Sequence, residues 1–131
     1  MNALSHSSRI RKRIVQLASR RRAVERLLLS RKEMYKGTVV KVLRTCGNPG
    51  CKCARGHKHQ CWQISASIEG KTRTRHVPRK YIAEIGSLTN NYRRFRSARA
   101  TWVRINSEIR ELINQLEAAK TTEDFSDGDR R

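Results

Sequence analysis

Apolar residues recur at helical spacing along the first quarter of the chain. Residues 7–36 contain no Pro or Gly, and their main apolar positions lie four, three, seven and four residues apart. These positions are Ile10, Ile14, Leu17, Val24 and Leu28. Such intervals place side chains on one face of an α-helix, so the pattern predicts one helix over residues 7–36, ending before Gly37.

A second helical pattern follows Pro78, a residue that suits the first turn of a helix. Its apolar positions are spaced close to a heptad repeat. They are Ile82, Ile85, Leu88, Tyr92, Phe95, Trp102, Ile105, Ile109, Leu112 and Leu116. We expect a helix over residues 78–120, bent or interrupted near Gly86 and the polar run 89–91.

The segment between the two helices has the period-two pattern of β-strands. Residues 38–44 are rich in β-branched side chains, residues 61–69 alternate apolar and polar positions, and residues 72–77 follow a turn at 69–71. A three-residue loop would place Arg73 and Arg75 on the polar face of the preceding strand, and a two-residue loop would place them on its apolar face. We expect a three-stranded β-unit over residues 37–77.

These elements define an α+β protein in which two long helices flank a small three-stranded β-unit. Neither helix can bury its apolar stripe alone, so the helices should pack as an antiparallel pair or against another copy of the chain, as in a homodimer. Residues 1–120 then form a single domain. Residues 121–131 are polar and acidic and are predicted to be disordered.

The charge of the chain narrows the choice of partner. The 131 residues include 30 Lys and Arg but only 11 Asp and Glu, which gives a net charge of +19. A polyanion is the simplest partner that relieves such self-repulsion, and nucleic acid is the leading one. No segment resembles a signal peptide or an apolar span of about 18–20 residues, so we expect a cytoplasmic protein with no membrane partner.

Metal-ligand chemistry is concentrated in one short segment. Cys46, Cys51, Cys53 and Cys61 fall within sixteen residues. In a reducing compartment such clustering indicates metal ligation, and zinc is the expected cofactor; free or redox-active thiols are the weaker alternative. With two histidines nearby, the potential ligands exceed the four that one zinc ion needs. A site filled by protein ligands has no position for water, which disfavours catalysis.

Residues 46–59 read Cys-Gly-Asn-Pro-Gly-Cys-Lys-Cys-Ala-Arg-Gly-His-Lys-His, and Gly-Lys-Thr-Arg and Val-Pro follow at 70–73 and 77–78. This segment resembles a bacterial and archaeal family of short proteins of unknown function, marked by Cys-Gly-x-Pro-x-Cys-x-Cys-Ala-x-Gly-x-x-His-Gly-Pro-Tyr. The resemblance implies Cys46, Cys51, Cys53 and His59 as ligands. The family's Gly-Pro-Tyr is replaced here by residues 60–62, so Cys61 is an alternative fourth ligand. An association of the family with mobile genetic elements implies a helper of a recombinase, a transposase or another nucleoprotein complex.

No paired carboxylates, nucleophile–base pair or phosphate-binding loop is found, so the chain is predicted not to be an enzyme. We expect it to bind nucleic acid through the phosphate backbone. Its residues favour neither DNA nor RNA. The residues expected to contact nucleic acid are Arg20, Arg21, Arg22, Arg44, Lys52, Arg55, Lys58, Lys71, Arg73, Arg75, Arg93, Arg94 and Arg96. The alternative function is a protein–protein adaptor whose coiled-coil seam docks a larger DNA- or RNA-processing enzyme.

Overall fold

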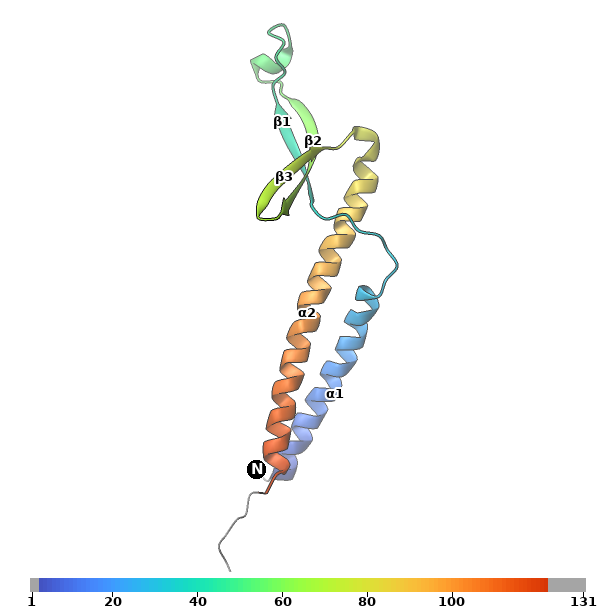
Figure 1. Ribbon diagram of the computed structural model, residues 1–131, viewed down its shortest axis with the longest axis vertical. Helices are drawn as coiled ribbons and strands as arrows, with labels where there is room; N and C mark the ends of the chain where they lie inside the picture. The colour runs from blue at the N-terminus through green and yellow to red at the C-terminus, as the bar shows by residue number, and fades with distance from the viewer. Residues whose placement is uncertain (1–2, 123–131) are drawn as a thin grey trace, which may run out of the picture. The chain divides into compact units, whose positions relative to one another are not determined.

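A computed structural model describes residues 3–122 of the chain, so nearly all of the tail predicted to be disordered lies outside the described residues. The prediction of an α+β protein is confirmed, because two long helices accompany one three-stranded antiparallel sheet (Figure 1). In chain order the elements are α1 (Ala3–Leu28), β1 (Thr38–Arg44), the short 3₁₀ helix η1 (Lys52–Arg55), β2 (His59–Ile68), β3 (Lys71–His76), the 3₁₀ helix η2 (Arg79–Tyr81) and α2 (Ile82–Lys120).

Backbone packing divides the chain into two compact units. Unit 1 comprises the described residues of Met1–Leu29 and Ala98–Arg131, and unit 2 comprises Ser30–Ser97. Unit 1 therefore contains α1 and most of α2, whereas unit 2 contains the sheet and the start of α2. The prediction of a single domain over residues 1–120 stays a prediction.

In unit 1 the two helices run antiparallel, as expected. Side-chain contacts join Arg13 to Glu108, Arg21 to Asn106 and Glu25 to Trp102. The partner's number falls along α2 as the number rises along α1, which is the signature of antiparallel packing. The predicted apolar stripe of α1 faces this contact: Leu17 is buried with Ile105 and Ile109, and Ile14, Val24 and Leu112 pack around them.

The first helix ends earlier than predicted. It stops at Leu28 rather than at residue 36, and residues 30–36 have no regular structure. Their backbone bonds instead to α2: the Tyr35 N–H donates to the Leu88 carbonyl at 3.1 Å, and Asn91 Nδ2 donates to the Glu33 carbonyl at 3.0 Å. Tertiary hydrogen bonds replace helical ones here, although no Pro or Gly stops the helix locally.

The second helix is continuous where a bend was predicted. It runs unbroken through Gly86 and residues 89–91. Thr89 is buried, and its hydroxyl donates to the Gly86 carbonyl at 3.0 Å, so the polar side chain is satisfied within the helix. Within residues 3–122, neither helix has an apolar stretch long enough to cross a membrane.

Unit 2 is built on a sheet with strand order β1-β2-β3. The loop between β2 and β3 has two residues, Glu69 and Gly70, with φ of 52° and 76°, as in the type I′ turns that join hairpin strands. Of the two possible loop lengths, the structure therefore has the loop of two residues. Ile64 pairs with Arg75, so Arg73 and Arg75 share the face of Ile64 rather than the serine face.

Gly37 allows β1 to approach β2 closely. Its φ is +141°, and a Cβ built on it would lie 2.8 Å from Ile64 Cγ1 and 2.9 Å from the Ser65 carbonyl oxygen. Ile64 is buried on β2, so neither neighbour can move away cheaply. A residue with a side chain at position 37 must therefore push the first strand off the second.

We predict that Gly37→Ala destabilises the protein by about 1–3 kcal/mol, because it introduces both a steric overlap and an unfavourable φ. Thermal unfolding followed by circular dichroism measures the effect. Gly86→Ala is the matched control: nothing lies within 4 Å of a Cβ there, and alanine favours a helix interior by up to about 1 kcal/mol over glycine. Equal melting temperatures for the two variants would contradict the close approach at Gly37.

Candidate metal centre

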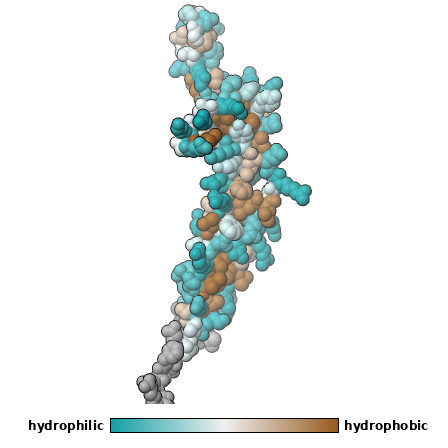
Figure 2. Space-filling view, viewed as in Figure 1, coloured by the Kyte–Doolittle hydropathy of each residue, from teal (hydrophilic) through white to brown (hydrophobic). Residues whose placement is uncertain are grey.

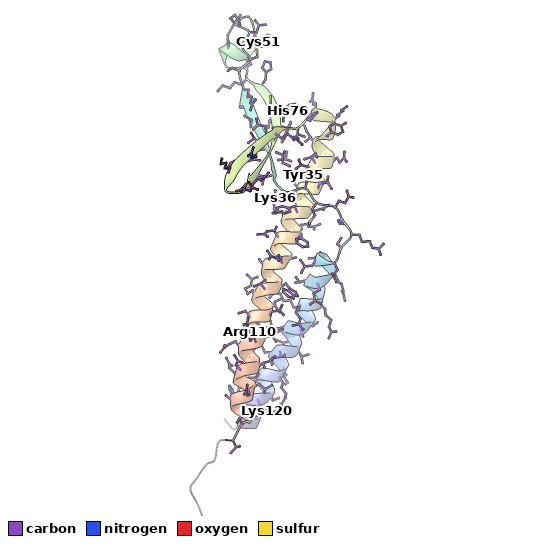
Figure 3. All side chains as sticks on the ribbon, in the orientation of Figure 1. Tyr35, Lys36, Cys51, His76, Arg110 and Lys120 are labelled. Carbon is purple, nitrogen blue, oxygen red and sulfur yellow. The ribbon has the colours of Figure 1, made fainter. Side chains whose placement is uncertain are left out.

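Three cysteines and one histidine gather between the end of β1 and the start of β2. Cys46 lies two residues after β1, Cys51 precedes η1, Cys53 lies within it, and His59 is the first residue of β2. The pairing of Arg44 with His59 closes the ladder at this end, so the chain before and after the loop is held together. Figure 3 labels Cys51 within this loop.

Short hydrogen-bonded turns fold the loop. The Asn48 carbonyl accepts from the Cys51 N–H at 3.1 Å, with Pro49 in the position that favours such a turn, and the Asn48 side chain accepts from the Gly50 N–H at 3.0 Å. The Cys51 carbonyl then accepts from the Ala54 N–H at 3.1 Å. Gly56, with φ +104°, ends the 3₁₀ turn in a left-handed conformation. These turns bring the three thiols within reach of one another.

The ligand atoms fit a tetrahedral metal ion. Those of Cys46, Cys51, Cys53 and His59 all lie within 4.8 Å of one another. Cys46 Sγ is 3.3 Å from Cys53 Sγ, and Cys51 Sγ is 3.3 Å from His59 Nε2. Metal–ligand bonds of about 2.0–2.3 Å in a tetrahedron separate ligand atoms by roughly 3.3–3.8 Å, so a small adjustment completes the geometry. The four residues can therefore hold a metal ion.

The local environment shifts the pKa values of the two closest thiols, Cys46 and Cys53, in opposite directions. Hydrogen bonding from the Asn48 backbone, with contributions from the Cys53 and Cys51 side chains, lowers the pKa of Cys46. For Cys53, the Cys46 N–H donates to the sulfur at 3.2 Å and lowers the pKa, but burial and the neighbouring thiols raise it, and the net shift is upward. Two sulfurs this close disfavour two negative charges, which a bound cation would compensate.

Cys61 lies outside the group. It is two residues beyond His59 on β2, about 6.6 Å along a strand, and its ladder partner is Val42. It lines a separate pocket with Trp62 and His76. The structure thus brings His59, rather than the alternative Cys61, to the other three ligands. His57 is exposed and also lies outside the group.

The basic residues predicted to bind nucleic acid are distributed over both units. Four lie in or next to the loop that holds the metal group, at Arg44, Lys52, Arg55 and Lys58; three lie on β3, at Lys71, Arg73 and Arg75; and three lie on α2, at Arg93, Arg94 and Arg96. All ten are exposed. Within the described part of the chain, no ion pair neutralises any cation of unit 2. Figure 2 shows a strongly hydrophilic surface along β3.

Arg21 differs from the other predicted contacts. It is half-buried in unit 1, where it donates to Asn106 Oδ1 at 2.9 Å and lies 3.7 Å from Glu25. Its side chain supports the helix pair, whereas Arg20 and Arg22 are exposed.

Two further cations of unit 2, which the sequence patterns did not single out, lie close to predicted contacts. Lys41 shares a sheet face with Arg73 and Arg75, and its Nζ lies 6.0 Å from the Trp62 ring centroid. Lys36 lies next to Gly37 and lines a pocket with Arg93 and Arg96. The alternation along β1 carries a signal for Lys41, but no sequence pattern marks Lys36.

Fold and site together define a small α+β protein whose β-unit carries a Cys₃His group able to hold a metal ion. The chain belongs to the family described as a domain of unknown function, DUF6788, which matches residues 8–87. That match covers most of α1, the sheet, the metal group and the start of α2. No curated protein and no solved structure matches the chain.

We predict that Cys53→Ser lowers metal affinity by at least about 100-fold, since one of four ligands accounts for roughly a quarter of a binding free energy of about 10–16 kcal/mol. Titration of the full chain with Co²⁺, followed by thiolate-to-metal absorption, measures this. Cys61→Ser is the matched control and should leave the spectrum and the affinity unchanged. An equal loss in both variants would place Cys61 among the ligands.

Proposed function

We propose that this protein is a non-enzymatic, zinc-containing nucleic-acid-binding protein that contacts the phosphate backbone. The observation that carries the proposal is the combination found in unit 2: a Cys₃His group and sixteen Lys and Arg, against three Glu, in the same 68 residues. A metal ion would stabilise the fold of a segment whose positive charges repel one another, and a polyanion would neutralise its surface.

The ligand chemistry supports zinc as the metal. Three thiolates and one imidazole form a ligand set common in structural zinc sites. Unit 2 also needs such a stabilising ion, because its buried apolar residues are only Cys53, Ile64 and Val77 among those described. A core this small contributes little folding free energy, and metal binding would supply the difference.

The distribution of charge supports nucleic acid as the partner. The edge strand β3 is exposed along its whole length and alternates Lys71, Arg73 and Arg75 with Thr72 and Thr74. Alternation gives the three cations one face of the strand, at a spacing of about 6.6 Å. Phosphates along a nucleic-acid strand have a comparable repeat, and unpaired Lys and Arg gain from releasing the counterions condensed there.

A structural role for the metal argues against enzymatic activity. Four protein ligands would leave no coordination position for a substrate or an activated water molecule. The three glutamates of unit 2 are exposed and separate: Glu33 precedes β1, Glu69 lies in the turn between β2 and β3, and Glu84 lies in α2, so they do not form a carboxylate pair there. Binding rather than catalysis is the function that this chemistry supports.

We further propose that the protein acts within a larger nucleoprotein complex, such as that of a mobile-element recombinase or transposase. This step depends on the resemblance of residues 46–59 to proteins associated with mobile elements. Backbone contacts position a protein on nucleic acid without reading bases, which suits an accessory factor.

An adaptor is the second function that an observation favours. In unit 1, Val15, Val103 and Ile113 are exposed by 69%, 55% and 50% although they lie on paired helices. Such side chains can dock a partner protein. An adaptor would bind nucleic acid weakly on its own and tightly only with its partner, whereas a direct binder retains its affinity alone.

We predict that the purified protein contains one zinc ion per chain and binds unrelated duplex DNA, single-stranded DNA or RNA with a steep salt dependence. If about five phosphates are contacted, affinity should fall by roughly 500-fold between 50 and 200 mM salt. Elemental analysis and fluorescence anisotropy at several salt concentrations measure the two properties. Metal-free protein that binds and melts as the native protein does would refute the structural role of zinc.

Charge variants test the direct contact. Arg73→Ala and Arg75→Ala should each weaken binding and reduce the salt slope by about one. Arg13→Ala is the control with the same charge change, because Glu108 already pairs with Arg13 at 3.0 Å. If all three variants lose affinity equally, the effect comes from net charge and β3 is not the contact surface.

A further inference from the structure

A pocket of about 280 Å³ lies within unit 2, where the start of β1, the last residues of β2 and the first half of α2 meet. Lys36, Arg93 and Arg96 contribute cations to its lining, and Thr38, Ser65 and Ser67 contribute hydroxyl groups. Its volume is at the small end of the roughly 300–1,000 Å³ of small-molecule sites. The pocket therefore suits a compact group rather than a large ligand, and Gly37, Ala66 and Tyr92 complete its lining.

The strand side of the pocket is set by Gly37. Because this residue has no side chain, β1 begins in direct contact with Ile64 and the Ser65 carbonyl. Thr38 then pairs with Ser65 in the ladder, and paired residues point to the same face of the sheet. Ser67, two residues along β2, shares that face. Three hydroxyl groups thus lie on one face beside the entry to β1.

The helix side is fixed by the irregular segment before β1. The Tyr35 N–H donates to the Leu88 carbonyl, and Asn91 Nδ2 donates to the Glu33 carbonyl, so the chain is fastened to α2 on both sides of Met34. Lys36 follows directly. Arg93 and Arg96 lie one and two turns beyond Leu88 and are neighbours at i,i+3 on the helix surface. Figure 3 labels Tyr35 and Lys36 beside α2.

The lining has the chemistry of a phosphate site. Its three cations have no ion-pair partner among the described residues, and no Asp or Glu lines the pocket. Guanidinium groups bind phosphate oxygens through paired N–H donors, lysine adds a point charge, and hydroxyl groups add further donors. A tetrahedral anion with several acceptor oxygens satisfies this set better than a planar carboxylate.

We infer that the pocket formed by Lys36, Thr38, Ser65, Ser67, Arg93 and Arg96 binds a single phosphate group, and that nucleic acid supplies this phosphate. The second part rests on the proposed function; the first does not. The pocket would hold one phosphate of the nucleic-acid strand in a defined position. The cations of β3 would contact the neighbouring phosphates without a defined geometry. The other source of the same chemistry is free inorganic phosphate.

Two measurements on the full chain test the inference. The first is a titration with inorganic phosphate, monitored by NMR through the backbone amide chemical shifts of Ser65, Ser67 and Arg93. A titration with sulfate at equal ionic strength serves as the comparison. The second is anisotropy of a labelled oligonucleotide. Lys36→Ala should weaken both interactions about tenfold, as expected for a lost charge-assisted hydrogen bond. Lys32→Ala is the matched control: it removes an exposed lysine from the same segment and should change affinity less than about twofold.

Two further comparisons keep the test valid if one variant misfolds: one removes a neutral side chain, and the other compares a second pair of charged side chains. Ser67→Ala leaves the charge unchanged and should also weaken phosphate binding. Arg93→Ala should weaken phosphate binding more than Arg94→Ala does, since Arg94 does not line the pocket. Unchanged melting temperatures in these variants confirm that the fold is kept.

The outcomes separate the two proposals. Loss of both interactions in Lys36→Ala, with Lys32→Ala near native, supports the site and its source. Tight oligonucleotide binding that Lys36→Ala and Lys32→Ala weaken equally overturns the phosphate pocket and leaves the proposed function standing. Saturable, Lys36-dependent phosphate shifts without any oligonucleotide binding support the pocket, refute nucleic acid as its source and refute the proposed function.

Discussion

The antiparallel pairing of β1 with β2 is the interaction on which unit 2 depends. At one end of this ladder Arg44 pairs with His59, and the loop between them holds the metal group. At the other end Thr38 pairs with Ser65, beside the cationic pocket. A slip of one residue would move His59 to the opposite face and away from the cysteines. Both sites therefore depend on one register, and buried Ile64 together with side-chain-free Gly37 holds it.

Much of this arrangement is predictable from local pattern. The stripe of Ile10, Ile14 and Leu17 predicts α1 and the face that it buries, because helical periodicity follows directly from the position of the core. The cysteine spacing and the resemblance of the surrounding motif single out the residues that the structure brings together. What they do not decide is the choice between His59 and Cys61, which depends on where β2 begins. The predicted strand began at Cys61, two residues late.

Features set by tertiary contact escaped prediction. Residues 30–36 contain no Pro or Gly that would stop the helix, but the Lys32 N–H donates to Ser30 Oγ, and hydrogen bonds join the segment to Leu88 and Asn91. These bonds replace helical ones after Leu28. Gly86 should weaken a helix, yet buried Thr89 bonds to its carbonyl and α2 continues. Lys36 is an ordinary exposed lysine in the sequence. It becomes part of a pocket because those same hydrogen bonds fasten its segment to α2.

The composition of unit 2 sets two requirements that point to different ligands. Sixteen cations against three acids oppose compaction, and three buried apolar residues among those described supply little to offset that repulsion. A divalent metal ion in the Cys₃His group would join the two ends of the loop, but with three thiolates it would form a group with a net charge of only about −1, which leaves nearly all of the positive charge of unit 2 in place. The exposed cations of β3 and α2 would remain unpaired. Folding and charge balance are thus separate problems in this segment, since a bound metal ion would address the first and an anionic partner would address the second.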